Sequence, residues 1–145
     1  MTRPVLRSFI GLLVVPALLA GCNEDGPVVP TATTKFVMTS VTEPAAKRVF
    51  EAAAEPPSDD AGWQAVAAGA RETAESARRL IRAVRGGNKA VWAEQANAMI
   101  AAADKAAAAA AAHDAKSLEA ASEALYGTCE GCHRVFQAAN RAASG

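Results

Sequence analysis

The segment Lys116–Ala143, KSLEAASEALYGTCEGCHRVFQAANRAA, places apolar or small side chains three or four positions apart along its whole length. This spacing matches the 3.6-residue turn of an α-helix, so the segment is predicted to form one long amphipathic helix. Such a helix cannot stand alone, because its apolar stripe has to be covered by neighbouring elements. The predicted inward face consists of Leu118, Ala121, Leu125, Cys129, Cys132, Phe136 and Ala139.

Three further helices are predicted ahead of this one, over residues 33–54, 60–84 and 89–112. Pro44 should kink or restart the first, since proline lacks the amide hydrogen that an interior helical bond requires. The sequence therefore predicts an all-α fold, an antiparallel four-helix bundle with short loops. The predicted inward residues of these helices are Met38, Val41, Ala45, Val49 and Ala52; Trp63, Val66, Ala70, Ala74, Ala77, Ile81 and Val84; and Trp92, Ala96, Met99, Ala103 and Ala110.

The composition narrows the classes of function. Hydrophobic residues make up 51% of the 145 residues but aromatic residues only 5%, and much of the remainder is alanine. Alanine favours helix yet buries little area, so the core should be thin and a large buried cofactor would help to fill it. The 15 basic and 15 acidic side chains balance to a formal charge of zero. A nucleic-acid partner is therefore not expected, because such proteins carry a basic excess.

The motif Cys129-Glu130-Gly131-Cys132-His133 lies in the second half of the C-terminal helix. C-x-x-C-H is the attachment pattern of c-type haem. Residues three and four apart share a helix face, so Cys129 and Cys132 can reach the vinyl groups of one haem c while His133 presents a ring nitrogen to the iron. Three alternatives are a thioredoxin-like redox pair, which belongs beside a βαβ pattern, half of a zinc site, which needs four ligands, and a disulfide within the helix.

The N-terminus has the features of an export signal. Arg3 and Arg7 precede an apolar stretch, residues 9–20, that is shorter than the about 20 residues of a comfortable membrane span. The stretch ends in Leu19-Ala20-Gly21-Cys22, which resembles the lipobox of bacterial lipoproteins. This resemblance implies that Cys22 is acylated and becomes the first mature residue. The alternative is an ordinary signal peptide that is cut nearby, with Cys22 incidental.

These features divide the chain into three parts. Residues 1–21 are predicted to be a lipoprotein signal peptide, residues 22–32 a flexible tether, and residues 33–145 the four-helix haem-binding domain. Several acyl chains anchor a protein stably where one does so only marginally. We therefore expect a periplasmic protein that its lipid anchors to a membrane. The sequence does not distinguish the inner membrane from the outer membrane.

The position of the motif in the last helix gives the domain a family resemblance. A four-helix chain with C-x-x-C-H near its C-terminus resembles the cytochrome c-prime family, the class II c-type cytochromes. The first predicted helix, with FVMTSVTEPAA over residues 36–46, also resembles a subgroup in which a methionine precedes a Pro-Ala-Ala turn. The sequence departs from the family at Gln137, where many members carry an arginine after the aromatic residue that Phe136 keeps here.

The sixth ligand of the iron decides between the expected functions. In a bundle of this topology the first helix packs against the last, so Met38 is the candidate axial ligand opposite His133. His/Met coordination raises the reduction potential and favours electron transfer. The alternative is that Met38 is a core residue or a wall of the distal pocket, and Met99 is a weaker candidate. Five-coordinate iron could then bind nitric oxide or carbon monoxide, as several cytochromes c-prime do.

We therefore expect a lipid-anchored electron carrier with one covalent haem c, and not an enzyme. Its partners are expected to be redox proteins of the periplasm or the membrane, and dimers among the family leave a homodimer open. One alternative is a cytochrome c-prime-like protein that binds nitric oxide or carbon monoxide at five-coordinate iron. Another is an accessory lipoprotein whose haem mainly stabilises the bundle.

Overall fold

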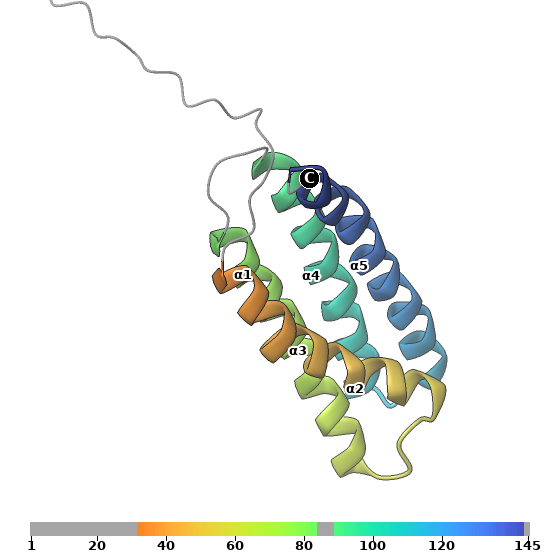
Figure 1. Ribbon diagram of the computed structural model, residues 1–145. Coiled ribbons are helices and arrows are strands. Elements are labelled where there is room, and N and C mark those ends of the chain that lie inside the picture. The colour runs from red at the N-terminus through yellow and green to blue at the C-terminus, as the bar shows by residue number, and fades with distance from the viewer. Residues whose placement is uncertain (1–31, 84–88, 144–145) are drawn as a thin grey trace, which may run out of the picture.

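The computed structural model describes residues 32–83 and 89–143, with side chains described over 34–83 and 89–137 (Figure 1). The predicted signal peptide, the lipidation residue Cys22 and the tether up to residue 31 lie outside the described residues. So does the connection between the second and third predicted helices, with its Gly86-Gly87 pair. None of the described helices is both long enough and apolar enough to cross a bilayer.

The described residues form an all-α fold, as predicted. The elements are α1 (Ala32–Val37), the π-helical segment η1 (Met38–Thr42), α2 (Glu43–Ala54), α3 (Asp60–Ala83), α4 (Lys89–Ala111) and α5 (Ala115–Ala143). The first three follow one another without a break, so they make one continuous helical run that we call the first helical run. It and the helices α3, α4 and α5 alternate in direction and form a four-helix bundle (Figure 1). The predicted helix bounds agree with the observed ones to within one residue.

The interruption predicted at Pro44 takes the form of a π turn. Pro44 stands in the first turn of α2, and the Glu43 amide donates to the Met38 carbonyl five residues back. Proline cannot donate to the residue four before it and its ring crowds that carbonyl, so the backbone widens by one residue ahead of it. The predicted inward stripe is consequently shifted in its first half. Val37 and Thr42, five apart, are buried, while Met38 and Val41 are only half-buried.

The core consists of two apolar clusters. The larger one is built mainly from alanine side chains of α2, α3, α4 and α5, together with Val49, Trp63, Met99, Leu118 and Leu125. The smaller one, at the other end of the bundle, contains Val37, Leu80, Trp92 and Phe136, with Met38 and Cys132 against it. The predicted inward faces of α3 and α4 are confirmed at every position except Ile81, which is half-buried, and Val84, which lies outside the described residues.

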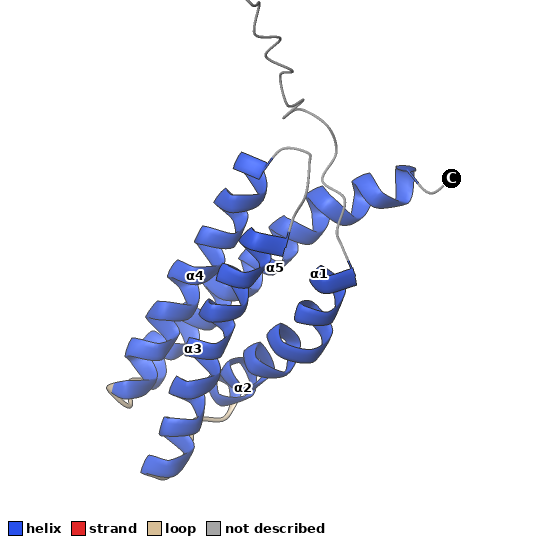
Figure 2. Cartoon of the chain, turned by 90° about the vertical axis from the view of Figure 1, so that its left-hand side faces the viewer, coloured by secondary structure: helices blue, strands red, loops and turns tan. Residues whose placement is uncertain are grey.

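The first helical run covers α3 more closely than it covers α5. Gly69 lets α2 approach α3, because a Cβ atom there would lie 3.0 Å from the Ala45 carbonyl oxygen. An ion pair of 3.1 Å between Arg48 and Glu72 joins the same two helices on the surface. α5 meets this run chiefly through α2, while α1 and η1 rest on α3 (Figure 2). The predicted packing of the first helix on the last therefore holds for its second half.

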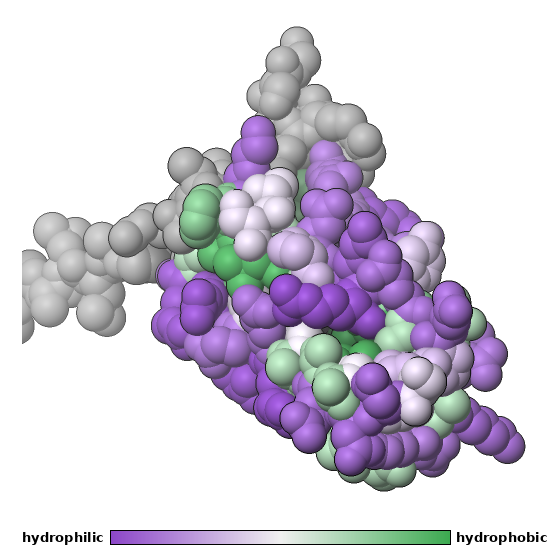
Figure 3. Space-filling model, turned by 90° about the horizontal axis from the view of Figure 1, so that it is seen from below, coloured by the Kyte–Doolittle hydropathy of each residue, from purple (hydrophilic) through white to green (hydrophobic). Residues whose placement is uncertain are grey.

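The end of the bundle next to the larger apolar cluster is closed by a helix cap and an aromatic stack. α4 ends where His113 takes a left-handed conformation with φ of 53°, and the Asp114 amide donates to the Ala109 carbonyl at 3.0 Å. The His113 ring stacks on Trp63 with centroids 5.3 Å apart. Seen from this end, the surface is largely hydrophilic, with limited apolar patches between charged side chains (Figure 3). Trp63 therefore belongs to the core at this end, on the inward face predicted for its helix.

Candidate functional site

A cavity of about 580 Å³ lies where the first helical run stands off from α5. Its lining includes residues of both apolar clusters, so it occupies the level at which the core is interrupted. The volume falls in the range of about 300–1,000 Å³ that is typical of small-molecule and cofactor sites. Its apolar wall is formed by Met38, Ala46, Phe50, Leu80, Trp92, Ala96, Met99 and Phe136.

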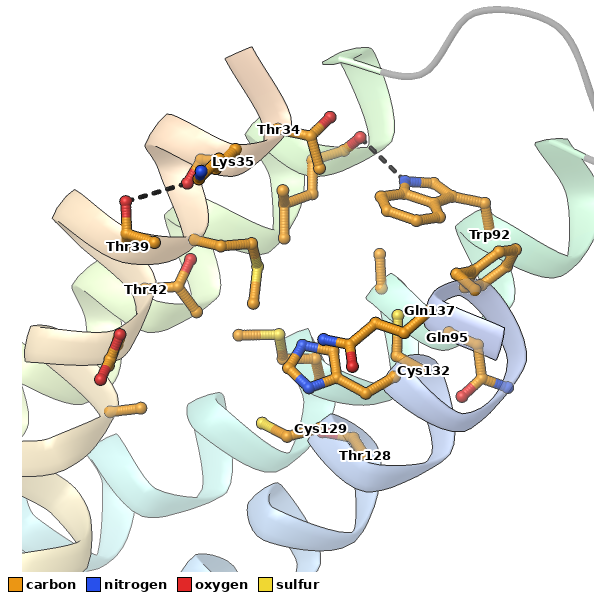
Figure 4. Close-up of a pocket in the computed structure, with 18 of the residues that line it drawn as sticks. Thr34, Lys35, Thr39, Thr42, Trp92, Gln95, Thr128, Cys129, Cys132 and Gln137 are labelled. Atoms are coloured by element: carbon orange, nitrogen blue, oxygen red, sulfur yellow. Dashed lines mark hydrogen bonds between the residues drawn. The ribbon is translucent and has the colours of Figure 1, made fainter. Parts of the chain in front are cut away.

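Cys129, Cys132 and His133 of the C-x-x-C-H motif all line this cavity. Both cysteines are half-buried, and His133 is exposed to solvent. In Figure 4, Cys129 and Cys132 lie on one side of the space, while Thr39 and Thr42 of the first helical run lie on the other. The helical spacing of the motif thus brings its side chains together in the way that the sequence predicted. A large cofactor attached to these thiols would lie in the gap between the two walls.

Gly131 leaves space within the motif for a side chain of α4. A Cβ atom at this position would lie 3.2 Å from the Oε1 atom of Gln95 on α4, which is tighter than ordinary contact. Gln95 itself lines the cavity (Figure 4). The glycine between the two cysteines therefore leaves room for the end of the Gln95 side chain, a role that the sequence did not indicate beyond the absence of bulk.

Burial keeps both thiols protonated. It raises the pKa of Cys132 to about 11, with a smaller contribution from the neighbouring Cys129. It also raises the pKa of Cys129, against an opposing hydrogen bond from Thr128. Catalytic redox cysteines have the opposite property, a lowered pKa that supplies thiolate at neutral pH. Both thiols are free in the structure. The site therefore does not have the electrostatics of a thioredoxin-like pair.

The described part of the chain contains no cluster of three or more His, Cys, Asp or Glu side chains that could hold a metal ion directly. A structural zinc site requires four such ligands. The fold thus does not bring further ligands of these types next to the motif within the described residues, so it does not support the zinc interpretation.

Met38 reaches the same cavity from the opposite wall. It is the first residue of η1, is half-buried, and packs against the smaller apolar cluster. Met99 of α4 also lines the cavity and is fully buried. Both candidate methionines are therefore next to the space that the motif faces, and Met38 alone stands on the wall that faces α5.

The charged side chains of the lining are exposed to solvent. Lys35, Glu43 and Lys47 are exposed on the first helical run, and Gln137 is exposed on α5. Lys47 pairs with Glu51 at 3.5 Å on the outer surface. The cavity thus has a mainly apolar interior, in which Thr34 and Thr42 are the buried polar residues, and charged groups at its rim. This arrangement suits a flat apolar group with charged substituents. Gln137, at which the sequence departs from the cytochrome c-prime pattern that it resembles, belongs to this rim.

Two lining residues carry functions that sequence reasoning missed. Trp92 was predicted only as an inward-facing core residue, but it also forms part of the cavity wall. Its ring nitrogen donates to the Leu80 carbonyl at 2.9 Å, and its ring meets Phe136 edge-on with centroids 4.7 Å apart. Thr42 lines the cavity from the end of η1. The signal for Thr42 was the proline two residues later, which predicts an irregular turn without saying which residue faces inward.

Comparisons of the chain with protein-family profiles, with curated proteins and with solved structures find no match. The function of the cavity is therefore inferred from its own residues.

Proposed function

We propose that this chain is a c-type cytochrome in which one haem is bound covalently through Cys129 and Cys132, with His133 as an axial ligand of the iron. The observation that carries the proposal is that all three motif side chains line a single apolar cavity of cofactor size. A motif that occurred by chance would have no reason to face an interruption in the core. The cavity is also the part of the fold that lacks apolar filling, and a porphyrin would supply it.

Each wall has a task in this proposal. The two thiols, protonated and half-buried, would hold the haem covalently, each S–H adding across one vinyl group to form a thioether. The apolar lining excludes water from the faces of the macrocycle, and the exposed rim accommodates its carboxylates. The haem iron supplies a one-electron couple when bound. Because the protein only has to hold this couple at a stable potential, we propose electron carriage and not catalysis.

Met38 is proposed as the second axial ligand. Its thioether lies on the wall opposite α5 and lines the same cavity as His133. Thioether coordination stabilises the reduced iron, and therefore raises the reduction potential. The second candidate function is binding of nitric oxide or carbon monoxide at five-coordinate iron. It is favoured by the gap between the first helical run and α5, which leaves room for a small ligand.

The cellular setting of the proposal rests on the sequence. The chain resembles the cytochromes c-prime in the position of its motif and a subgroup of them in the methionine ahead of Pro44. The lipobox-like Leu19–Cys22 supports a periplasmic lipoprotein held on a membrane by acylated Cys22, which exchanges electrons with redox proteins nearby. Replacing Cys22 with alanine should release the domain from membranes or block its processing. Unchanged membrane retention would exclude the lipid anchor.

The proposal is tested on protein exported by cells with intact cytochrome c maturation. Mass spectrometry should show the polypeptide with one added haem, and Cys129→Ala/Cys132→Ala should abolish the added mass. A mature wild-type chain without porphyrin would refute the proposal.

The axial ligand is tested by spectroscopy of the same protein. Wild-type ferric protein should be low-spin with the near-infrared thioether-to-iron band. Met38→Leu should lose that band, whereas Met99→Leu, the matched control on α4, should keep it. A high-spin wild-type spectrum that shifts when carbon monoxide is added would instead select the gas-binding alternative.

A further inference from the structure

An unusual group of polar side chains is buried between η1 and α3. Thr42, Thr73 and Ser76 are each at most 2% exposed, in a core that consists mainly of alanine and larger apolar residues. A buried hydroxyl without a partner costs about 1–3 kcal/mol, so such residues are expected only where their hydrogen bonds are made. No side-chain polar atom that is buried in the described part of the chain lacks a partner.

The hydrogen bonds of this group are directional. The Ser76 hydroxyl donates to the Thr73 carbonyl oxygen at 2.7 Å, which commits its only proton. The Thr42 hydroxyl therefore donates, and it lies 3.0 Å from the Ser76 oxygen and 3.2 Å from the Val37 carbonyl oxygen. Thr73 is different, because its hydroxyl donates to the Gly69 carbonyl within its own helix at 2.9 Å. Only Thr42 and Ser76 join η1 to α3 in this way.

The π turn between Val37 and Thr42 determines which side chain faces the cavity. In an uninterrupted α-helix, Met38 would stand four residues before Thr42 and would share its face against α3. With the additional residue, Val37 takes that place and is buried beside Leu80 of α3. Met38 is thereby rotated by about 100°, one residue's turn of the helix, into the lining of the cavity. π turns of this kind are frequent at functional sites.

We infer that Thr42 and Ser76 are positioning residues, whose hydrogen bond holds the π turn and thereby presents the Met38 thioether to the iron. This inference rests on the proposed function and adds to it the device that sets the sixth ligand. The Thr42 hydroxyl shares its one proton between the Ser76 oxygen on α3 and the Val37 carbonyl oxygen at the start of the turn. Loss of that hydroxyl removes the polar contact that distinguishes the π register from the α register.

The experiment compares four variants of the mature, haem-loaded protein. Thr42→Val keeps the shape but removes the hydroxyl, Thr42→Ser restores the hydroxyl, and Ser76→Ala removes the acceptor. Thr73→Val is the matched control, an equally buried threonine whose hydroxyl bonds only within α3. The readouts are the near-infrared thioether band, the affinity for carbon monoxide, and the resonance of the Met38 methyl group in methionine-labelled protein.

We expect Thr42→Val and Ser76→Ala to lower the ratio of thioether-ligated to unligated iron about fivefold or more, the effect of losing one hydrogen bond. Carbon monoxide affinity should rise by the same factor where Met38 occupies the sixth position, because the two ligands compete. Thr42→Ser and Thr73→Val should behave as wild type. An unchanged ratio in Thr42→Val, or an equal loss in Thr73→Val, would overturn the inference.

Two further readouts separate this inference from the proposed function. If wild-type iron lacks the thioether band, the chemical shift of the Met38 methyl group tests the inference instead. A large shift caused by the macrocycle in the wild type that disappears in Thr42→Val would support the positioning role. The absence of such a shift in the wild type would overturn the inference. If the chain carries no porphyrin, the proposed function fails. The rate of hydrogen exchange at the Glu43 amide then tests whether the Thr42 hydroxyl holds the π turn. Faster exchange in Thr42→Val but not in Thr73→Val supports the π-turn device, and equal exchange overturns it.

Discussion

The double variant Cys129→Ala/Cys132→Ala, freed of haem, is expected to remain helical but to lose much of its stability. The cavity that the thiols line has a volume of about 580 Å³. Cavities left in protein cores cost about 24 cal/mol per Å³, which gives about 14 kcal/mol for this one. That figure is a ceiling, because the relation holds for sealed cavities and this one is open to solvent between the first helical run and α5. Since whole domains are stable by only about 5–15 kcal/mol, even half of it would be decisive.

The loss should be concentrated at one end of the bundle. Trp92 lines the cavity, whereas Trp63 lies in the other cluster, stacked on His113. Each can be observed alone by replacing the other with phenylalanine. In the haem-free double variant, the fluorescence of Trp92 should shift towards that of exposed tryptophan, while that of Trp63 should stay close to its native value until the bundle melts.

Thermal and urea unfolding of the two single-tryptophan proteins provide the measurement. The haem-loaded parent should unfold in one transition, whereas the haem-free variant should lose Trp92 signal at lower urea than helical signal. The reasoning would be refuted if the variant unfolded in one transition with the parent's midpoint and an unchanged Trp92 spectrum. The cavity would then be collapsed or filled in solution without any cofactor.

Three further predictions concern the scaffold, each measured by urea unfolding. Gly127→Ala should stabilise the protein by about 1 kcal/mol, because a Cβ atom there meets nothing within 4 Å. Gly69→Ala should destabilise it by about 1 kcal/mol, because its Cβ atom would lie 3.0 Å from a backbone oxygen of α2. Equal effects of the two variants on the free energy of unfolding would contradict the observed packing. His113→Ala should cost about 1 kcal/mol through loss of the stack on Trp63, and His113→Gly should recover part of this because glycine adopts φ of 53° freely. Hydrogen bonds from the first turn of α5 lower the pKa of Asp114 from 3.8. The stabilisation that its carboxylate gives is therefore complete above about pH 4 and is lost as the pH falls further. Asp114→Asn should remove this part of the acid dependence of stability, and an unaltered pH profile would exclude a contribution from Asp114.

Much of the fold follows from local features that the sequence states directly. Helix bounds are set by apolar periodicity and by proline, glycine and polar caps, which act over a few residues. This is why the bounds predicted for α3, α4 and α5 agree with the structure to within one residue. The C-x-x-C-H motif is also local: its spacing on one helix is enough to place Cys129, Cys132 and His133 on a common wall, which the structure confirms.

The cavity wall opposite α5, which the first helical run forms, was decided only by the tertiary structure. Pro44 predicts an interruption, but whether the helix kinks, restarts or widens depends on what lies against it. The Thr42–Ser76 hydrogen bond and the burial of Val37 against α3 belong to the π register, and together they turn Met38 into the cavity. The gap between this wall and α5 likewise arises from how three helices pack, and no periodicity within one of them encodes it. Local propensity acts within a helical turn, whereas the register between helices is a property of their contacts.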